Sequence, residues 1–117
     1  MALHGYQTLF DSSVDNSAQA LKASAGQLYS VEISNIAATD GFLQLFDLAA
    51  ANVTVGTTVP KLSLFVPKGD ATNRGAMDKN FGPLGLDFQV AMSYAFTTTA
   101  TGNTALATAG VANFIFL

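Results

Sequence analysis

The segment from Leu86 to Thr97 constrains the fold more than any other part of the chain. Its large apolar residues take every second position, and the residues between them are small or polar. Side chains of a strand alternate between two faces, whereas a helical period would scatter these residues around an axis. The alternating apolar residues are Leu86, Phe88, Val90, Met92 and Tyr94. The pattern predicts one long, near-central strand of an antiparallel sheet.

Other segments also carry strand signals. Residues 28–36 alternate, and residues 42–47 follow Asp40-Gly41, the strongest short hairpin signal in the chain. Residues 60–67 lie between two prolines, which lack the donor that a strand ladder needs. Residues 111–117 are almost wholly apolar, so we expect protein to cover both faces of this strand. We expect one shared core, formed by Val31, Ile33, Leu62, Leu64, Phe88, Val90 and Met92.

Turn residues separate these segments, and no segment shows the period of a convincing amphipathic helix. The sequence therefore predicts an all-β fold, a single-domain antiparallel β-sandwich that is jelly-roll-like and carries an N-terminal arm. We place the arm at residues 1–11 and the β-sandwich domain at residues 12–117. Two interpretations of the arm stay open: a frayed terminus with a short edge strand, or an arm that reaches a neighbouring subunit.

The composition indicates that partners cover part of this protein. Of its 117 residues, 50% are hydrophobic and only 11% are charged. A domain of this size buries only about two-thirds of the surface that its unfolded chain exposes. No segment reaches the roughly 20 consecutive apolar residues of a membrane span, and the first residues do not resemble a signal peptide. Of the two remaining explanations, an aggregating chain or burial against partners, we favour burial through oligomerisation or docking on a larger assembly, and we expect no membrane partner.

Charge and cysteine content exclude further classes of function. The net charge is −3, and the five cations are too scattered to form a phosphate-binding stripe, so we expect no nucleic-acid partner. Because the chain has no cysteine, it has no disulfide framework and no thiolate metal site.

No motif predicts catalysis. A nucleophile–histidine–acid arrangement would need His4, the only histidine, and a single histidine near a terminus is usually an ordinary surface residue. The acidic residues fall mostly at predicted turns. Asp/Asn clusters at residues 11–16 and 70–73 offer oxygen ligands for calcium, but neither matches a known calcium loop. We therefore predict a protein that is not an enzyme, with no catalytic residues, no metal site and no cofactor.

Short segments along the chain carry a resemblance. They are Ala23-Ser24-Ala25-Gly26-Gln27-Leu28-Tyr29, Ile33-Ser34-Asn35, Phe42-Leu43-Gln44-Leu45-Phe46-Asp47, Val55-Gly56-Thr57-Thr58-Val59-Pro60, Gly85-Leu86-Asp87-Phe88, the Thr-rich residues 97–104 and the apolar terminal strand. Over residues 19–117 they resemble a group of small tailed-phage proteins that are thought to be virion components. The chain is also similar in size and style to capsid decoration, or cement, proteins.

The resemblance implies a non-enzymatic structural protein on the outer surface of a phage capsid, which stabilises the head by bridging capsomers. Its partners would be the major capsid protein and further copies of itself. We favour a homotrimer, because capsids offer three-fold and quasi-three-fold positions, and a dimer is the other possibility. The resemblance does not cover the arm, so composition alone predicts its interface residues, Tyr6, Leu9 and Phe10. The terminal strand adds Phe114 and Phe116, because it is apolar on both faces and we expect one face to meet a neighbouring subunit.

A tail- or fibre-associated module that binds host carbohydrate is the alternative function. Sugar sites need exposed aromatic platforms beside polar groups. The chain has no tryptophan, and most of its nine phenylalanines take core-like positions. Tyr6 and Tyr29 are the two aromatic residues that this alternative would use.

Overall fold

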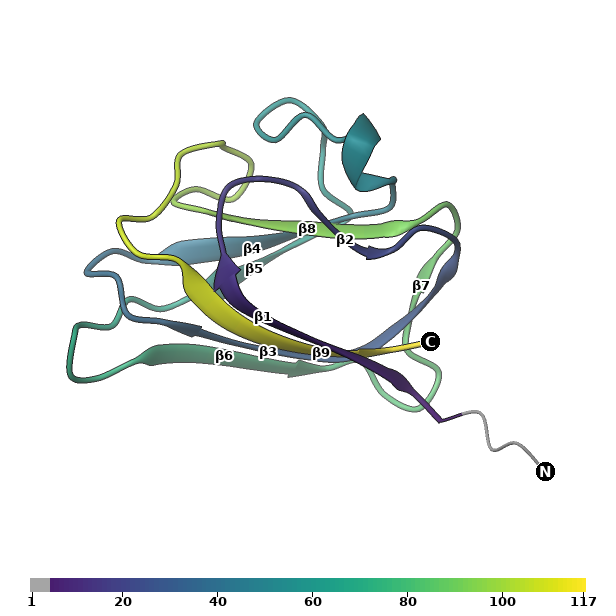
Figure 1. The fold of residues 1–117 in the computed structure, drawn as a ribbon, viewed down its shortest axis with the longest axis horizontal. Helices are drawn as coiled ribbons and strands as arrows, with labels where there is room; N and C mark the ends of the chain where they lie inside the picture. Colours follow the sequence, from purple (N-terminus) through teal and green to yellow (C-terminus); the bar gives the residue numbers. More distant parts are fainter. Residues whose placement is uncertain (1–4) are drawn as a thin grey trace.

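The computed structural model describes residues 5–117, which form two antiparallel β-sheets packed face to face (Figure 1). This confirms the predicted all-β, single-domain sandwich. No helix of the described residues has the length and apolar character that crossing a bilayer requires. The elements are β1 (Gln7–Val14), β2 (Gln19–Lys22), β3 (Gly26–Asn35), β4 (Gly41–Phe46), the 3-10 helix η1 (Ala50–Asn52), β5 (Leu62–Val66), β6 (Gly75–Asn80), β7 (Leu86–Phe88), β8 (Met92–Thr97) and β9 (Gly110–Phe116).

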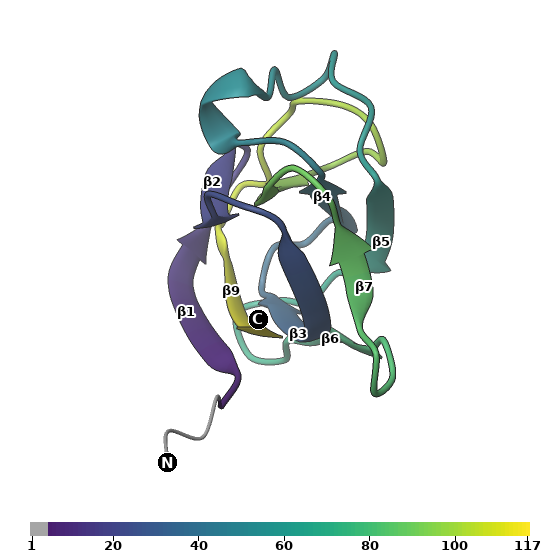
Figure 2. The same cartoon turned by 90° about the vertical axis from the view of Figure 1, so that its right-hand side faces the viewer.

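The strands divide between the sheets in a fixed order. Sheet A has the order β1-β9-β3-β6, and β7 also pairs with β3. Sheet B has the order β2-β8-β4-β5. The chain therefore moves back and forth between the sheets as it proceeds, and this order is compatible with a jelly roll. The turned view in Figure 2 shows β1 at one side of the molecule and β5 at the other.

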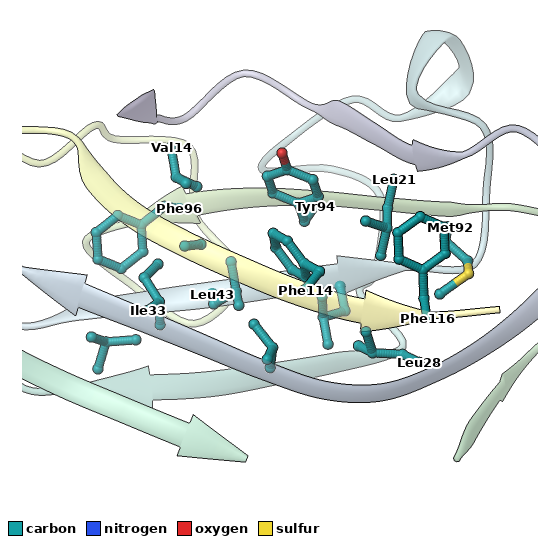
Figure 3. Close-up of a cluster of buried hydrophobic side chains, with 14 of the residues drawn as sticks. Val14, Leu21, Leu28, Ile33, Leu43, Met92, Tyr94, Phe96, Phe114 and Phe116 are labelled. Carbon is teal, nitrogen blue, oxygen red and sulfur yellow. The ribbon is translucent and has the colours of Figure 1, made fainter. Parts of the chain in front are cut away.

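The core lies between the sheets and consists of the inward-facing residues of each strand (Figure 3). Tyr94 of β8 and Phe114 of β9 meet across the sandwich with ring centroids 4.5 Å apart. Such aromatic contacts add stabilisation beyond the area they bury. The largest fully buried side chains include Tyr94, Phe46, Phe88, Phe96, Phe114, Leu28, Ile33, Leu43, Leu45 and Met92.

The predicted single strand over residues 86–97 is wrong, because β7 and β8 belong to different sheets. β7 pairs with β3 in sheet A, whereas β8 lies between β2 and β4 in sheet B. Phe88 and Met92 are each 1% exposed, but Val90, which lies in the connection between them, is 56% exposed. The predicted joint burial of these three residues therefore holds only for Phe88 and Met92.

Asp47 stabilises this connection from the end of β4. Its Oδ1 accepts hydrogen bonds from the N–H groups of Val90 at 2.8 Å and Ala91 at 3.3 Å, and its Oδ2 accepts one from Gln89 at 3.0 Å. Burial by itself raises the pKa of Asp47, but these three donors and the positive charge of Lys61 lower the pKa overall. The ionised carboxylate thus accepts hydrogen bonds from three backbone N–H groups that lie between β7 and β8 and have no acceptor in a strand ladder.

The predicted boundary at residue 11 falls inside β1. Gln7–Val14 pairs with β9, so residues 7–11 form part of the edge strand of sheet A rather than a separate segment. Residues 1–4 of the predicted arm lie outside the described residues.

Loops cover the outer face of sheet B (Figure 1). Gln44 of β4 is fully buried, and its Nε2 donates hydrogen bonds to Thr97 Oγ1 at 2.6 Å and to the Gly102 carbonyl at 2.9 Å. Ser63 Oγ donates to the Ala100 carbonyl at 2.7 Å, and Ser93 Oγ donates to the Leu48 carbonyl at 2.8 Å. β4 carries large side chains on both faces, and both faces are covered: Leu43 and Leu45 lie in the core, and Gln44 and Phe46 are buried on the outer side. The outer face of sheet A carries exposed side chains instead.

Candidate protein interface

The outer face of sheet A brings together side chains from four strands in rows that follow the strand register. Thr8, Ile115, Ser30 and Asn80 form one row across β1, β9, β3 and β6. Phe10, Asn113, Glu32 and Asp78 form the next row. Phe10 is 65% exposed and Ile115 is 38% exposed, so this face is apolar at β1 and β9 and becomes acidic at β3 and β6.

A shallow groove lies at one end of this face. Tyr6 and Tyr29 pack against each other with ring centroids 4.6 Å apart, and Tyr6 is 60% exposed. We call this feature the tyrosine groove. Its volume is about 420 Å³, and it is lined by Tyr6, Tyr29, Ser30, Asn80, Gly82, Pro83 and Ile115. The exposed Tyr6 ring and the partly buried Tyr29 ring, beside a serine hydroxyl and an asparagine amide, provide both stacking and hydrogen-bonding groups.

The acidic half of the face places two carboxylates side by side. Glu32 and Asp78 are register partners on β3 and β6, and like charges in such positions repel each other. Asn113 Nδ2 donates a hydrogen bond to Glu32 Oε1 at 3.3 Å, which relieves part of this repulsion. The two carboxylates would favour a positive group on a partner at this point of the face, and Arg74, whose Nη1 donates to Ser34 Oγ at 3.2 Å, adds a positive charge further along β3.

A second exposed apolar feature lies on the connection between β6 and β7. Leu84 is 84% exposed at the tip of a turn that the Gly85 N–H closes onto the Gly82 carbonyl at 3.2 Å. Gly82 and Gly85 have φ values of 83° and 74°, in the left-handed region that favours glycine. The backbone therefore holds an apolar side chain outward in a defined conformation.

The predicted interface residues fall into two groups. Tyr6 and Phe10 are exposed, and Leu9 is partly buried against the core. Phe114 and Phe116 are 0% and 4% exposed, so the prediction that they form an interface is wrong. β9 alternates, and its outward-facing residues are Val111, Asn113 and Ile115. The sequence did not single out Ile115, because a strand with apolar residues on both faces does not reveal which face is buried.

The Asp/Asn clusters that offer oxygen ligands for calcium are built from carboxylates that accept backbone hydrogen bonds. Asp70 Oδ1 accepts the N–H groups of Asn73 at 2.6 Å and Thr72 at 2.8 Å, and these bonds lower the pKa of Asp70. Asp11 and Asp15 likewise accept N–H groups two residues further on. Within residues 5–117, no group of three histidine or carboxylate side chains lies together as a metal site. His4 lies outside the described residues.

A larger hollow of about 660 Å³ opens at the end of the sandwich beside β7. Its polar lining includes Lys22, Gln27, Asp87 and Gln89, and Gln27 Nε2 donates a hydrogen bond to Asp87 Oδ1 at 3.0 Å. These residues come from separate strands and connections, so no local pattern in the sequence marks this hollow.

Comparisons with known proteins identify no family for this chain. No protein-family model matches the sequence, and a search of curated proteins gives no match. The function is therefore proposed from the fold, the exposed surfaces and the resemblance described above.

Proposed function

We propose that this protein is a non-enzymatic structural protein of a tailed-phage virion that decorates the outer surface of the capsid. The observation that supports this most strongly is a set of seven exposed large apolar side chains among the described residues of a 12.1 kDa chain. They are Tyr6, Phe10, Val59, Phe65, Leu84, Val90 and Ile115. Tyr6, Phe10 and Ile115 lie together on the outer face of sheet A, and an exposed apolar patch of this kind is typical of a surface that binds a partner.

Binding of this kind would stabilise a head mechanically. Each large apolar side chain that a capsomer covers contributes about 1.5–3 kcal/mol. A domain that contacts two capsomers adds this free energy to the contacts that expansion or internal pressure must break. The partner is the major capsid protein, and self-association would place several such domains at one symmetry position of the shell.

Quantitative mass spectrometry of purified virions tests the proposal. A decoration protein is expected at a copy number comparable with that of the major capsid protein. A copy number that is a small fraction of this value would contradict capsid decoration and indicate a tail or fibre component.

The tyrosine groove favours a second candidate function, a tail- or fibre-associated module that binds host carbohydrate. Its two rings and neighbouring polar groups have the composition of a shallow sugar site. Glycan-array binding that is lost in Tyr29→Ala and kept in Phe65→Ala would support this candidate. Absence of glycan binding by the unaltered protein would leave capsid decoration as the better proposal.

A further inference from the structure

Among residues 5–117 no strand pairs with the outer edge of β1, and this free edge differs from the other exposed sheet edges. β2 has only four residues and carries Lys22, β5 lies between Pro60 and Pro67, and β6 carries Asp78 and Lys79. Short length, proline and charge are devices that prevent one sheet edge from pairing with another. β1 has eight residues without proline or lysine. Its one acid, Asp11, binds the Tyr94 hydroxyl in the interior.

The backbone directions show which peptide groups occupy this free edge. Leu117 and Gln27 exchange two hydrogen bonds of 2.9 and 3.0 Å, so the peptide groups of Leu117 point toward β3. Successive residues of a strand direct these groups to opposite sides, so those of Phe116 point toward β1. Its register partner is Gln7. By the same alternation, the N–H and C=O groups of Thr8 and Phe10 point away from β9, into the free edge.

The side chains along this edge have a palindromic order. Leu9 packs toward the core, so Tyr6, Thr8 and Phe10 share the outer face of sheet A. The order aromatic, threonine, aromatic is the same in both chain directions. An antiparallel second copy would therefore place Tyr6 opposite Phe10 and Thr8 opposite Thr8. Aromatic pairs and threonine pairs are among the favourable cross-strand neighbours.

We propose that two copies of this chain pair through antiparallel β1 strands, about a two-fold axis at Thr8. The pairing joins the two copies of sheet A into one continuous sheet and is isologous, so it closes after two copies. It uses residues 5–11, in which Asp11 is the only charged residue, and it places Asp11 opposite Gly5.

Other registers are less favourable. An axis at Asp11 would bring two carboxylates together, and it would run into the irregularity between Asp11 and Val14 where the β1–β9 register shifts. An axis at Leu9 or Phe10 would leave Tyr6 without an aromatic partner across the pairing. The axis at Thr8 avoids both problems.

This inference does not depend on capsid decoration, because it concerns the free protein. It replaces the three-fold arrangement expected from capsid symmetry with a two-fold one. A dimer of this kind would also place the Phe10 ring of one copy beside the tyrosine groove of the other.

Disulfide trapping tests the register directly. The chain has no cysteine, so one introduced cysteine reports one contact. Partners in a hydrogen-bonded antiparallel pair have Cα atoms about 5.5 Å apart, within the range that a disulfide spans. Under mild oxidation, Thr8→Cys is expected to form covalent dimers. Asn113→Cys lies exposed on the same face but one strand further in, and is expected to stay monomeric. Equal cross-linking of the two variants would overturn the proposal.

Analytical ultracentrifugation tests the association itself. The unaltered protein is expected to show a concentration-dependent monomer–dimer equilibrium. Thr8→Lys places two ammonium groups opposite each other at the axis and is expected to weaken dimerisation by about tenfold or more. Asn113→Lys adds the same charge away from the edge and should leave the equilibrium unchanged. Circular dichroism checks that both variants are folded. A monomer at every concentration up to the millimolar range, or a trimer, would contradict the two-fold pairing.

Discussion

The hydroxyl of Tyr94 donates a hydrogen bond of 2.7 Å to the Asp11 carboxylate, and this contact joins β8 of sheet B to β1 of sheet A. Tyr94 itself is buried against Phe114 in the core. The bond therefore links an edge strand to the opposite sheet and holds β1 in place by more than its pairing with β9.

This contact predicts a stability loss at high pH. Burial raises the pKa of Tyr94 above its ordinary value, and the hydrogen bond and negative charge of Asp11 raise it further. A raised folded-state pKa means that the stabilisation is complete below the unfolded value of about 10 and declines as the pH rises above it. Urea unfolding at pH 7, 9 and 11 should show this decline in the unaltered protein.

Tyr94→Phe removes both the hydrogen bond and the titrating group. We expect a loss of about 1.5–3 kcal/mol at pH 7, the usual range for a hydrogen bond to a charged group. The free energy of unfolding should fall less above pH 10 in Tyr94→Phe than in the unaltered protein. The control variant Tyr29→Phe should show the same fall as the unaltered protein. An identical alkaline decline in Tyr94→Phe and the unaltered protein would show that other groups cause it.

The carboxylate of Asp47 predicts a stability loss at low pH. Its pKa is lowered in the folded protein, so its contribution is present above the unfolded value of about 4 and is lost as the pH falls through the folded value. Asp47→Ala should cost about 1–3 kcal/mol at pH 7, because three N–H groups lose their acceptor. Asp47→Asn should weaken the acid dependence, and Asp78→Asn, at an exposed position, is the matched control. Full acid dependence in Asp47→Asn would refute this role.

The separation of β7 from β8 predicts different costs for two neighbouring truncations. Phe88→Ala should destabilise the protein by about 3–5 kcal/mol, because it leaves a cavity in the core. Val90→Ala should change the free energy of unfolding by less than about 0.5 kcal/mol, because the side chain lies mostly in solvent. Urea midpoints of the two variants give the comparison. Similar large losses in both would support one continuous strand instead.

The exposed turn between β6 and β7 predicts a variant that binds capsids weakly but folds normally. Leu84→Lys replaces an apolar side chain that is 84% exposed, so its melting temperature should be unchanged. If capsomers cover this residue, decoration of empty heads should weaken by about tenfold or more, since burying leucine contributes about 1.5–3 kcal/mol. Thr72→Lys, on another exposed loop, is the control. Equal binding by Leu84→Lys and the unaltered protein would remove this turn from the interface.

The sequence determined the fold class and the positions of four of the nine strands of the described residues. The alternating residues 28–36 correspond to β3, because a period of two belongs to a strand in any surroundings. Residues 42–47, after the Asp40-Gly41 hairpin signal, correspond to β4, and residues 60–67, between the prolines, contain β5. The almost wholly apolar residues 111–117 likewise correspond to β9. These patterns are local, and local backbone geometry is enough to interpret them.

Only the tertiary structure decided which face of a strand is buried and where a strand ends. Phe114 and Ile115 are similarly apolar, but the sheets bury the first and expose the second. Residues 86–97 alternate without interruption, yet the chain changes sheets between β7 and β8. In that connection the Asp47 carboxylate, 43 residues from Val90, accepts the Val90 N–H. The free edge of β1 likewise depends on its pairing with β9 at the far end of the chain. A period of two defines two faces and two edges, but only long-range pairing determines which of them meet protein and which meet solvent.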